Sequence, residues 1–199
     1  RLLDLKLSEE EVFHISYEAE RFVHGTPSGI DPTISTFGGV LLYHKDRGFT
    51  RIKVKGELPL VIGDTGVKRS TGDLVATVHK ISKQHPSIIK PLLKISGRIA
   101  LRAVEALETA DLCELGELMN ISHGLLCAVR VSDASLERLI YAARGADALG
   151  AKLTGAGGGG CMIALAKPDK LTHVVDAIER AGGRAFVARI AEEGVRIEK

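Results

Sequence analysis

The sequence contains no hydrophobic run of the roughly 18 residues that a membrane-spanning helix needs. It also has no basic run, because its Lys and Arg are scattered and the formal net charge is only +2. Its first residues, 1–6, are not a charged head followed by a long apolar segment, so they do not resemble a secretory signal. These absences favour a cytoplasmic protein with a small-molecule substrate, without a nucleic-acid or membrane partner.

Cysteine is scarce as well. The three cysteines, Cys113, Cys127 and Cys161, form no CxxC pair, and an odd number without a secretory signal argues against a disulfide framework. We expect them to be reduced and structural. The seven histidines show no HxxxH or HxH spacing and none lies near a cysteine at zinc-finger distance, so no structural zinc site is expected. Any metal is expected to be Mg²⁺ that arrives with a nucleotide.

Hydrophobic periodicity predicts an α+β chain. With 199 residues, 45% of them hydrophobic, the chain can bury a substantial core, and it shows no internal repeat or clear linker. The pattern predicts strands at about 39–43, 50–54, 58–62, 152–154, 161–166 and 184–190. It predicts helices at about 8–23, 71–84, 86–107, 111–129, 132–148 and 170–181. Ser132 and the flanking Asp residues are expected helix caps.

The first predicted helix carries a candidate acid. Ser8 and Glu11 form a capping box that opens the helix. At 100° per residue, Glu20 falls about 80° from Val12, at the border of the expected buried stripe, so we expect a half-buried carboxylate there. That stripe consists of Val12, Ile15, Ala19 and Val23.

The most glycine-rich segment, Gly155 to Gly160, holds five glycines in six positions. It matches GxGxxG, but the apolar run from Cys161 predicts a strand where a dinucleotide-binding fold needs a helix. The segment is not a Walker loop either. A tight hairpin would need only one or two glycines at such positions, whereas five favour a concave backbone site for an anion such as phosphate. Both interpretations stay open on the run alone.

Asp31 is the second candidate acid. It precedes Pro32, which is the pattern of a helix N-cap followed by proline, so a structural role is one interpretation. It also lies eleven residues after Glu20, beyond a turn that contains Gly and Pro. Two such carboxylates can serve one pocket, where one holds Mg²⁺ and the other faces an alcohol, although the spacing alone does not establish this.

Four segments together resemble the GHMP kinases, the superfamily named for galactokinase, homoserine kinase, mevalonate kinase and phosphomevalonate kinase. In order, they are "ERFVHGTPSGIDPTISTFGG", "GDTGVKRSTGDLV", "ISHGLLCAVRVS" and "AKLTGAGGGGCMIAL", of which the first and last are the most specific. The match is close to the mevalonate kinase branch, particularly its archaeal type, and covers essentially the whole chain. It implies ATP- and Mg²⁺-dependent phosphorylation of the C5 hydroxyl of mevalonate in isoprenoid biosynthesis, and leaves a homodimer open.

The same resemblance implies roles for individual residues. Asp31 matches the residue commonly assigned as the base for the acceptor hydroxyl, and Glu20 matches the residue that binds the nucleotide's Mg²⁺. Thr71 is a weaker candidate for a substrate contact, because it could equally cap the helix that follows it. The family motif that packs beside the phosphate loop is matched here by the glycine-rich segment. Its residues expected to contact the nucleotide are Gly155, Ala156, Gly157 and Gly158. Gly155 and Ala156 are also expected to lie near the substrate.

The resemblance also implies a domain organisation. Residues 1–57 are expected to be the remainder of an N-terminal, ribosomal protein S5-like kinase domain, and 58–199 a C-terminal, ferredoxin-like α/β sandwich with added helices. The family's phosphate loop, PxxxGLGSSA, and its N-terminal lysine are not found, and the chain does not begin with Met. We therefore expect the C-terminal portion of a longer protein, inactive by itself.

Two alternatives stay open. The first is another GHMP kinase that acts on phosphomevalonate, homoserine or a sugar. The second is a non-catalytic, ligand-binding relative, although the presence of both Glu20 and Asp31 argues against it.

Overall fold

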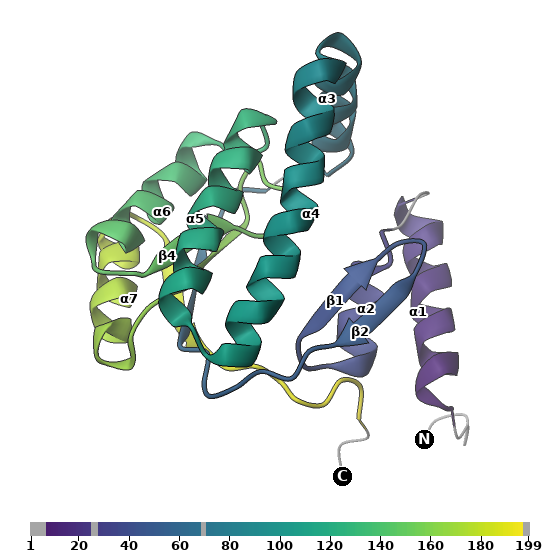
Figure 1. Ribbon diagram of the computed structural model, residues 1–199, viewed down its shortest axis with the longest axis horizontal. Coiled ribbons are helices and arrows are strands. Elements are labelled where there is room, and N and C mark those ends of the chain that lie inside the picture. Colours follow the sequence, from purple (N-terminus) through teal and green to yellow (C-terminus); the bar gives the residue numbers. More distant parts are fainter. Residues whose placement is uncertain (1–6, 25–27, 69–70, 197–199) are drawn as a thin grey trace. The chain divides into compact units, whose positions relative to one another are not determined.

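The computed structural model describes residues 7–24, 28–68 and 71–196. The chain divides into two compact units (Figure 1). One unit comprises the described residues up to Lys53 together with those from Ile190 onward, and the other runs Val54–Arg189. The last residues therefore group with the first unit, whereas the sequence analysis placed 58–199 together. The assignment of the two parts to named kinase domains stays a prediction.

The first unit consists of two helices and a hairpin. Helix α1 (Glu9–His24) begins with the predicted capping box, in which Glu11 N donates to Ser8 Oγ at 3.2 Å and Ser8 N donates to Glu11 Oε2 at 2.8 Å. Helix α2 (Ile30–Phe37) follows, and strands β1 (Leu41–His44) and β2 (Gly48–Arg51) pair antiparallel. The hairpin confirms the prediction, with the strand ends shifted by one to three residues.

The predicted buried stripe of α1 is wrong in phase. Ile15 is 58% exposed and Ala19 is exposed, while Val12 is only half-buried and the side chain of Val23 lies outside the described residues. The face that packs is set by aromatic rings: Phe13 contacts Phe37 of α2 with ring centroids 5.9 Å apart. A ring offers more apolar area than Ile15, so packing against α2 overrides the aliphatic pattern.

Helix α2 was not predicted, and it changes the interpretation of Asp31. The N-cap is Gly29, at φ 79°, and Asp31 is the second residue of the helix, with an exposed side chain. The expected N-cap role of Asp31 is therefore wrong. Gly29 carries the turn because a Cβ there would lie 2.6 Å from the Tyr43 hydroxyl and 3.2 Å from the Tyr17 ring.

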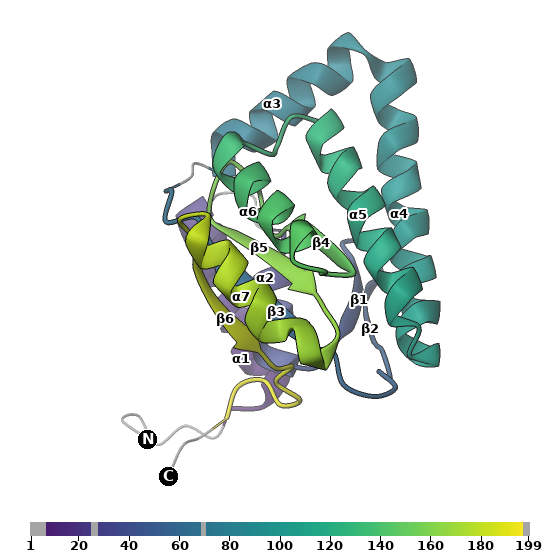
Figure 2. The ribbon, with the colours of Figure 1, turned by 90° about the vertical axis from the view of Figure 1, so that its left-hand side faces the viewer.

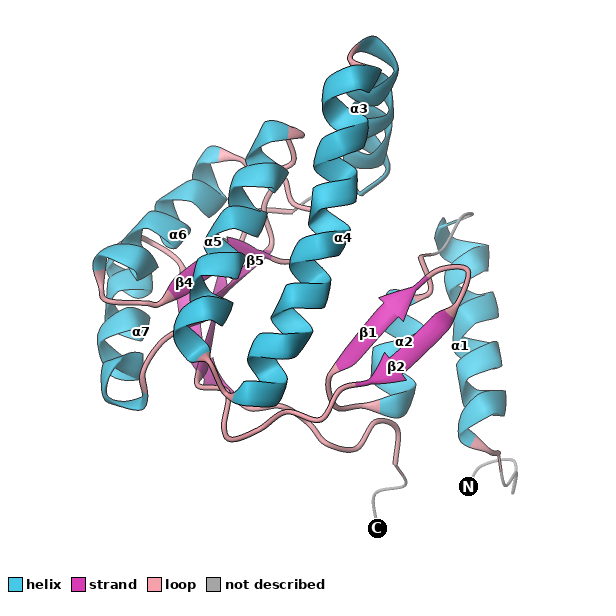
Figure 3. Cartoon of the chain, viewed as in Figure 1, coloured by secondary structure: helices cyan, strands magenta, loops and turns pink. Residues whose placement is uncertain are grey.

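The second unit contains a four-stranded sheet in the order β4-β5-β3-β6 (Figure 2). Figure 3 colours the strands magenta and the helices cyan. The strands are β3 (Leu60–Asp64), β4 (Gly150–Leu153), β5 (Cys161–Leu165) and β6 (Arg184–Ala188). All neighbours are antiparallel, with Leu60 opposite Leu165 on one side and Ala188 on the other. With one helical segment between β3 and β4 and another between β5 and β6, this is the predicted ferredoxin-like β-α-β-β-α-β arrangement.

Helices cover the sheet and extend beyond it. Helices α6 (Ala134–Gly145) and α7 (Leu171–Arg180) pack side by side against the sheet, while α5 (Leu112–Ala128) lies along strand β4 (Figure 2). A short 3₁₀ turn, η1 (Pro168–Lys170), precedes α7, and two further helices, α3 (Thr71–Gln84) and α4 (Pro86–Thr109), lead into α5. Among the described residues, no helix has the length and apolar character required to cross a membrane.

The helix predictions hold closely where local signals are strong. Helix α3 has the predicted bounds, and Asp111 caps α5 by accepting a hydrogen bond from Glu114 N at 3.0 Å. Asp133 caps α6 by accepting one from Leu136 N at 2.9 Å. Ser132 does not cap α6; its hydroxyl donates to the Glu137 carboxylate instead.

Helix α5 approaches strand β4 closely because two glycines face each other. A Cβ on Gly116 would lie 2.6 Å from the carbonyl carbon of Leu149, and one on Gly150 would overlap the Gly116 carbonyl oxygen. The approach brings Asn120 onto the strand edge, where its amide donates to Leu149 O at 3.2 Å and accepts from Ala151 N at 3.1 Å. The side chain thereby satisfies backbone groups that an edge strand otherwise leaves unpaired.

Replacing Gly116 with Ala should force α5 away from β4. We expect Gly116→Ala to lower the free energy of unfolding of the complete protein by about 1–3 kcal/mol, the usual cost of overpacking. Gly124→Ala is the matched control on the same helix, because a Cβ added there would meet nothing within 4 Å; it should raise stability by up to about 1 kcal/mol. Urea unfolding of both variants measures the difference, and equal effects would contradict the close contact.

Candidate functional site

The five glycines of the run lie in the glycine loop, residues 154–160, which joins β4 to β5. All five have positive φ: 72° for Gly155, 87° for Gly157, 65° for Gly158, 110° for Gly159 and 72° for Gly160. Residues with a side chain rarely adopt these angles, so the loop conformation requires glycine. Because β5 follows directly, the dinucleotide-binding interpretation is excluded, as the sequence predicted.

Three segments enclose the glycine loop. Gly158 N donates to Val131 O at 2.8 Å, and a Cβ on Gly157 would overlap the same carbonyl oxygen. A Cβ on Gly158 would lie 2.9 Å from Leu74 Cδ1 of α3, and one on Gly159 would lie 2.9 Å from Val67 O. The loop is thus held between the connection that follows β3, helix α3 and the α5–α6 turn, defined here as residues 129–133.

Several backbone amides of the glycine loop lack an acceptor among the described residues. Gly158 and Gly160 donate to Val131 O and Val67 O, respectively. Within the described part of the chain, the amides of Gly155, Ala156, Gly157 and Gly159 have no hydrogen-bond acceptor. Consecutive free amides without side chains form a concave site for an anion, and phosphate is the anion that such loops commonly accept.

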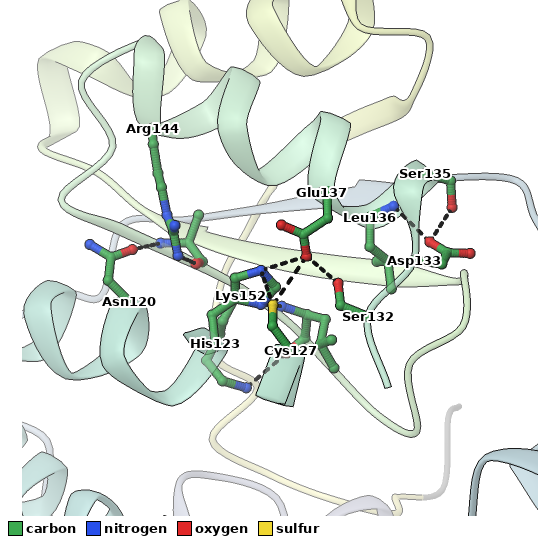
Figure 4. Close-up of polar contacts among 12 residues, drawn as sticks. Asn120, His123, Cys127, Ser132, Asp133, Ser135, Leu136, Glu137, Arg144 and Lys152 are labelled. Carbon is green, nitrogen blue, oxygen red and sulfur yellow. Dashed lines mark hydrogen bonds and ion pairs between the residues drawn. The ribbon is translucent and has the colours of Figure 1, made fainter. Parts of the chain in front are cut away.

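A polar cluster lies behind the α5–α6 turn (Figure 4). His123 Nε2 lies 3.0 Å from Glu137 Oε1, and Cys127 Sγ lies 3.3 Å from the same oxygen. The Ser132 hydroxyl also donates to Glu137 Oε1. On its other side, His123 Nδ1 accepts a long hydrogen bond, 3.5 Å, from the backbone N of Leu153, the last residue of β4. The cluster therefore ties together two helices, a turn and a strand.

The protonation states in the cluster follow from burial and hydrogen bonding. Burial lowers the pKa of His123; the Glu137 carboxylate opposes this, while the Arg144 and Lys152 cations reinforce it, so the imidazole is neutral at pH 7. Burial alone would raise the pKa of Glu137, but hydrogen bonds from Ser132, Cys127 and His123 outweigh it and lower that pKa, so the carboxylate is ionised. Burial, reinforced by Glu137, raises the pKa of the Cys127 thiol, which stays protonated.

The same three side chains could be considered as a metal site, because their donor atoms lie within 4.8 Å of one another. The tautomer of His123 argues against it. Nδ1 accepts from Leu153 N, which places the hydrogen on Nε2, where it donates to Glu137. A metal-binding histidine normally donates its other ring N–H to an acceptor, whereas here it would face a backbone N–H. We therefore interpret the cluster as a hydrogen-bonded network.

In the first unit, Glu20 is half-buried, as predicted, whereas Glu10 and Glu18 are exposed. Its Oε2 atom is fully buried without a hydrogen-bond partner in the described residues. A buried carboxylate oxygen without a donor is costly, so this position fits a bound cation such as Mg²⁺. Burial raises the pKa of Tyr43, and the charges of Tyr17 and Glu20 add to that effect.

The other two candidates have more open surroundings. Asp31 is exposed in the first turn of α2, where its charge is favourable toward the helix N-terminus. Thr71 is exposed and is the first residue of α3, and the position before it lies outside the described residues. The structure thus places Asp31 and Glu20 in the first unit and Thr71 and the glycine loop in the second.

Comparison with known proteins gives consistent matches. Residues 103–185 match the family model described as GHMP kinases C terminal. The chain is 48% identical over 204 residues to the mevalonate kinase of Pyrococcus abyssi, which covers 100% of this chain and 60% of that protein. It is 39% identical over 196 residues to the mevalonate kinase of Aeropyrum pernix, which covers 97% of this chain and 60% of that protein.

A solved structure agrees with these matches. The crystal structure of L. major mevalonate kinase in complex with R-mevalonate matches with a TM-score of 0.84 and 38% identity, over 93% of this chain and 58% of that chain. Residues 103–185 belong to the GHMP kinase C-terminal family. The chain spans about 60% of the length of the curated relatives that it matches.

Sequence reasoning missed the cluster around Glu137. The statement that no histidine lies near a cysteine at zinc-finger distance was wrong, because His123 and Cys127 are four residues apart on α5 and share one face. Their i, i+4 spacing was a signal that could have been recognised. The participation of Glu137 was not visible in the sequence, because it depends on the way α6 turns back against α5.

The neutral state of His123 can be measured directly. We expect an imidazole NMR titration midpoint below the ordinary value of 6.5, because burial lowers its pKa. Since the unfolded chain then takes up a proton that the folded chain does not, the stability due to this group falls as pH drops below about 6.5. The resonance is assigned by its loss in His123→Gln. A titration midpoint at or above 6.5 would contradict the lowered pKa of His123.

Proposed function

We propose that the complete protein transfers the γ-phosphoryl group of ATP to the C5 hydroxyl of mevalonate. The observation that carries this proposal is the 48% identity to an archaeal mevalonate kinase across 100% of this chain. The glycine loop supports it, because free backbone amides at positions that only glycine can adopt suit a phosphate-bearing ligand. We also propose a cytoplasmic location. The homodimer stays a prediction.

The glycine loop would hold the nucleotide by its backbone. In this proposal the amides of Gly155, Ala156 and Gly157 face phosphate oxygens, and Gly158 contributes mainly by fixing the loop, because its own amide is bonded to Val131. Gly155 and Ala156 also lie close to the acceptor in this proposal, and Thr71 is a weaker contact. Backbone donors are already oriented before the ligand binds, so they need little reorganisation as negative charge moves during transfer.

The two carboxylates would serve the acceptor and the metal. Asp31 is exposed and ionisable, so it can orient the C5 hydroxyl and accept its proton. Glu20 would hold Mg²⁺ through its buried, unpartnered Oε2 atom. When bound, Mg²⁺ neutralises charge on the phosphates. Because the transition state of phosphoryl transfer is loose, most of the rate enhancement would come from positioning and charge neutralisation.

The rival kinases of the superfamily are supported by fold alone. The galactokinase of Lactococcus lactis is 21% identical and the phosphomevalonate kinase of Streptococcus pneumoniae 18% identical to this chain, with TM-scores of 0.75 and 0.77. These values establish a shared fold, but they do not select a substrate. The mevalonate proposal is favoured because the mevalonate kinases of Pyrococcus abyssi and Aeropyrum pernix are 48% and 39% identical to this chain over the aligned residues.

The proposal predicts the acceptor that the complete protein uses. Purified with its upstream region, it should release ADP from ATP when mevalonate is present, and not with phosphomevalonate, homoserine or galactose. A coupled assay of ADP release with the four acceptors in parallel measures this. ADP release with a different acceptor would support kinase activity but contradict mevalonate as the substrate. Release with none of the four would contradict the proposed activity.

Two carboxamide variants should separate the carboxylate roles. Asp31→Asn should lower kcat by roughly 10² to 10⁴, the usual contribution of a general base, with little change in the KM for ATP. Glu20→Gln should raise the Mg²⁺ concentration needed for half-maximal activity, because it removes a charged metal ligand. Each variant is the control for the other, measured by steady-state kinetics across a Mg²⁺ titration. If both variants behave alike, the two roles are not separate.

A further inference from the structure

We propose that Glu137 is a positioning residue that holds the glycine loop in its ligand-binding conformation through two hydrogen-bonded routes. Glu137 lies on α6, outside the loop itself. Both routes begin at its Oε1 atom. One ends at the backbone N of Gly158, in the middle of the loop, and the other at the backbone N of Leu153, directly before the loop.

The first route runs through the α5–α6 turn. The Ser132 hydroxyl donates to Glu137 Oε1, and the neighbouring carbonyl of Val131 accepts from Gly158 N at 2.8 Å. Arg130, in the same turn, has φ 63°, a left-handed conformation that non-glycine residues rarely adopt. Such a turn keeps its shape only where its surroundings fix it, and the Ser132–Glu137 hydrogen bond is one of those constraints.

The second route runs through α5. His123 Nε2 lies 3.0 Å from Glu137 Oε1, and His123 Nδ1 accepts from Leu153 N at 3.5 Å. Leu153 is the last residue of β4 and is fully buried, so its position determines where the glycine loop begins. The loop is therefore supported at its first end by His123 and in its middle by Val131.

Glu137 is the residue that the two routes share. Its Oε1 atom accepts from three donors, on Ser132, Cys127 and His123, and hydrogen bonds to an ionised carboxylate are stronger than those between neutral groups. The loop has almost no room to shift without cost, because a Cβ at Gly157 would already overlap Val131 O. A small displacement of the turn would therefore be passed directly to the loop backbone.

The consequence for the reaction rests on the proposed function, in which the glycine loop binds the phosphates of ATP. If the network relaxes, free amides of the loop no longer point to fixed positions. Binding of the nucleotide should then weaken, while the proton transfer proposed for Asp31 is unaffected. This differs from a loss of global stability, which would lower the apparent kcat through the amount of folded protein and leave the KM values unchanged.

Amide hydrogen exchange tests the positioning role without using activity. In the complete protein, Ser132→Ala should increase exchange at Gly158 about tenfold or more, because a hydrogen bond to a charged acceptor is lost. Ser135→Ala is the matched control, since its hydroxyl donates to the Asp133 carboxylate at 2.7 Å and takes no part in either route. Ser132→Thr keeps the hydroxyl and should restore slow exchange. Amides in the centre of the sheet, such as that of Ala164, should be unchanged in all three variants.

Steady-state kinetics supply the second readout. Glu137→Gln and Ser132→Ala should each raise the KM for ATP several-fold, with a smaller change in kcat and in the KM for the acceptor. Unchanged exchange at Gly158 in both variants would overturn the positioning role, as would exchange that rises equally throughout the sheet. Faster exchange at Gly158 without a change in the KM for ATP would support the positioning role of the network and contradict nucleotide binding by the loop.

Discussion

The outer edge of β4 is the constraint on which the second unit depends. An edge strand exposes unpaired backbone groups, and here α5 lies along that edge and supplies side-chain partners for them. Asn120 bonds to Leu149 O and Ala151 N, and His123, one turn later, accepts from Leu153 N. Arg144, from α6, donates to Ala151 O at 2.7 Å. The strand is thereby fixed along its length up to the point where the glycine loop begins.

The three segments that enclose the glycine loop explain why the loop needs so many glycines. A two-residue hairpin would connect β4 to β5 with less chain, so the length of the connection is not required by the strands. The loop passes between Val131 O, Leu74 and Val67 O, and each of these would collide with a Cβ. The hairpin and anion-site interpretations are therefore compatible: the same backbone conformation joins antiparallel strands and leaves amides without acceptors.

Local signals in the sequence predicted local structure well. The capping box at Ser8, the bounds of α3 and the strand after the glycine run are all decided by neighbouring residues, and all were predictable. The face of α1 was not, because Phe13 packs on Phe37, a partner 24 residues away. Helix α2 was missed because its N-cap is Gly29, which has a left-handed conformation at a position where a Cβ would collide with the Tyr43 hydroxyl.

The candidate site also combines features that the sequence predicted with features that it could not predict. Glu20 is half-buried as predicted, although the stripe from which this was predicted is wrong in phase. Its unpartnered Oε2 atom could not be predicted, because hydrogen-bond satisfaction depends on every surrounding element. Likewise, five glycines in six positions indicated an unusual backbone, but not which amides would be free. The Glu137 network joins residues from α5, the α5–α6 turn, α6 and β4. No window of sequence contains them all, so no local pattern could identify it.

The charge state of the Glu137 network decides how it can act. A protonated His123 would form an ion pair with Glu137, but its Nδ1–H would then face the backbone N–H of Leu153, and one hydrogen bond would be replaced by repulsion between two donors. Burial already disfavours that form, and the positive charges of Arg144 and Lys152 disfavour it further. The network therefore consists of an ionised carboxylate that accepts hydrogen bonds from neutral donors. These bonds are directional, and they form without the desolvation cost of a second buried charge. Because each donor has a fixed direction, such a network can transmit a defined geometry to the loop, which an ion pair of two mobile charges would not.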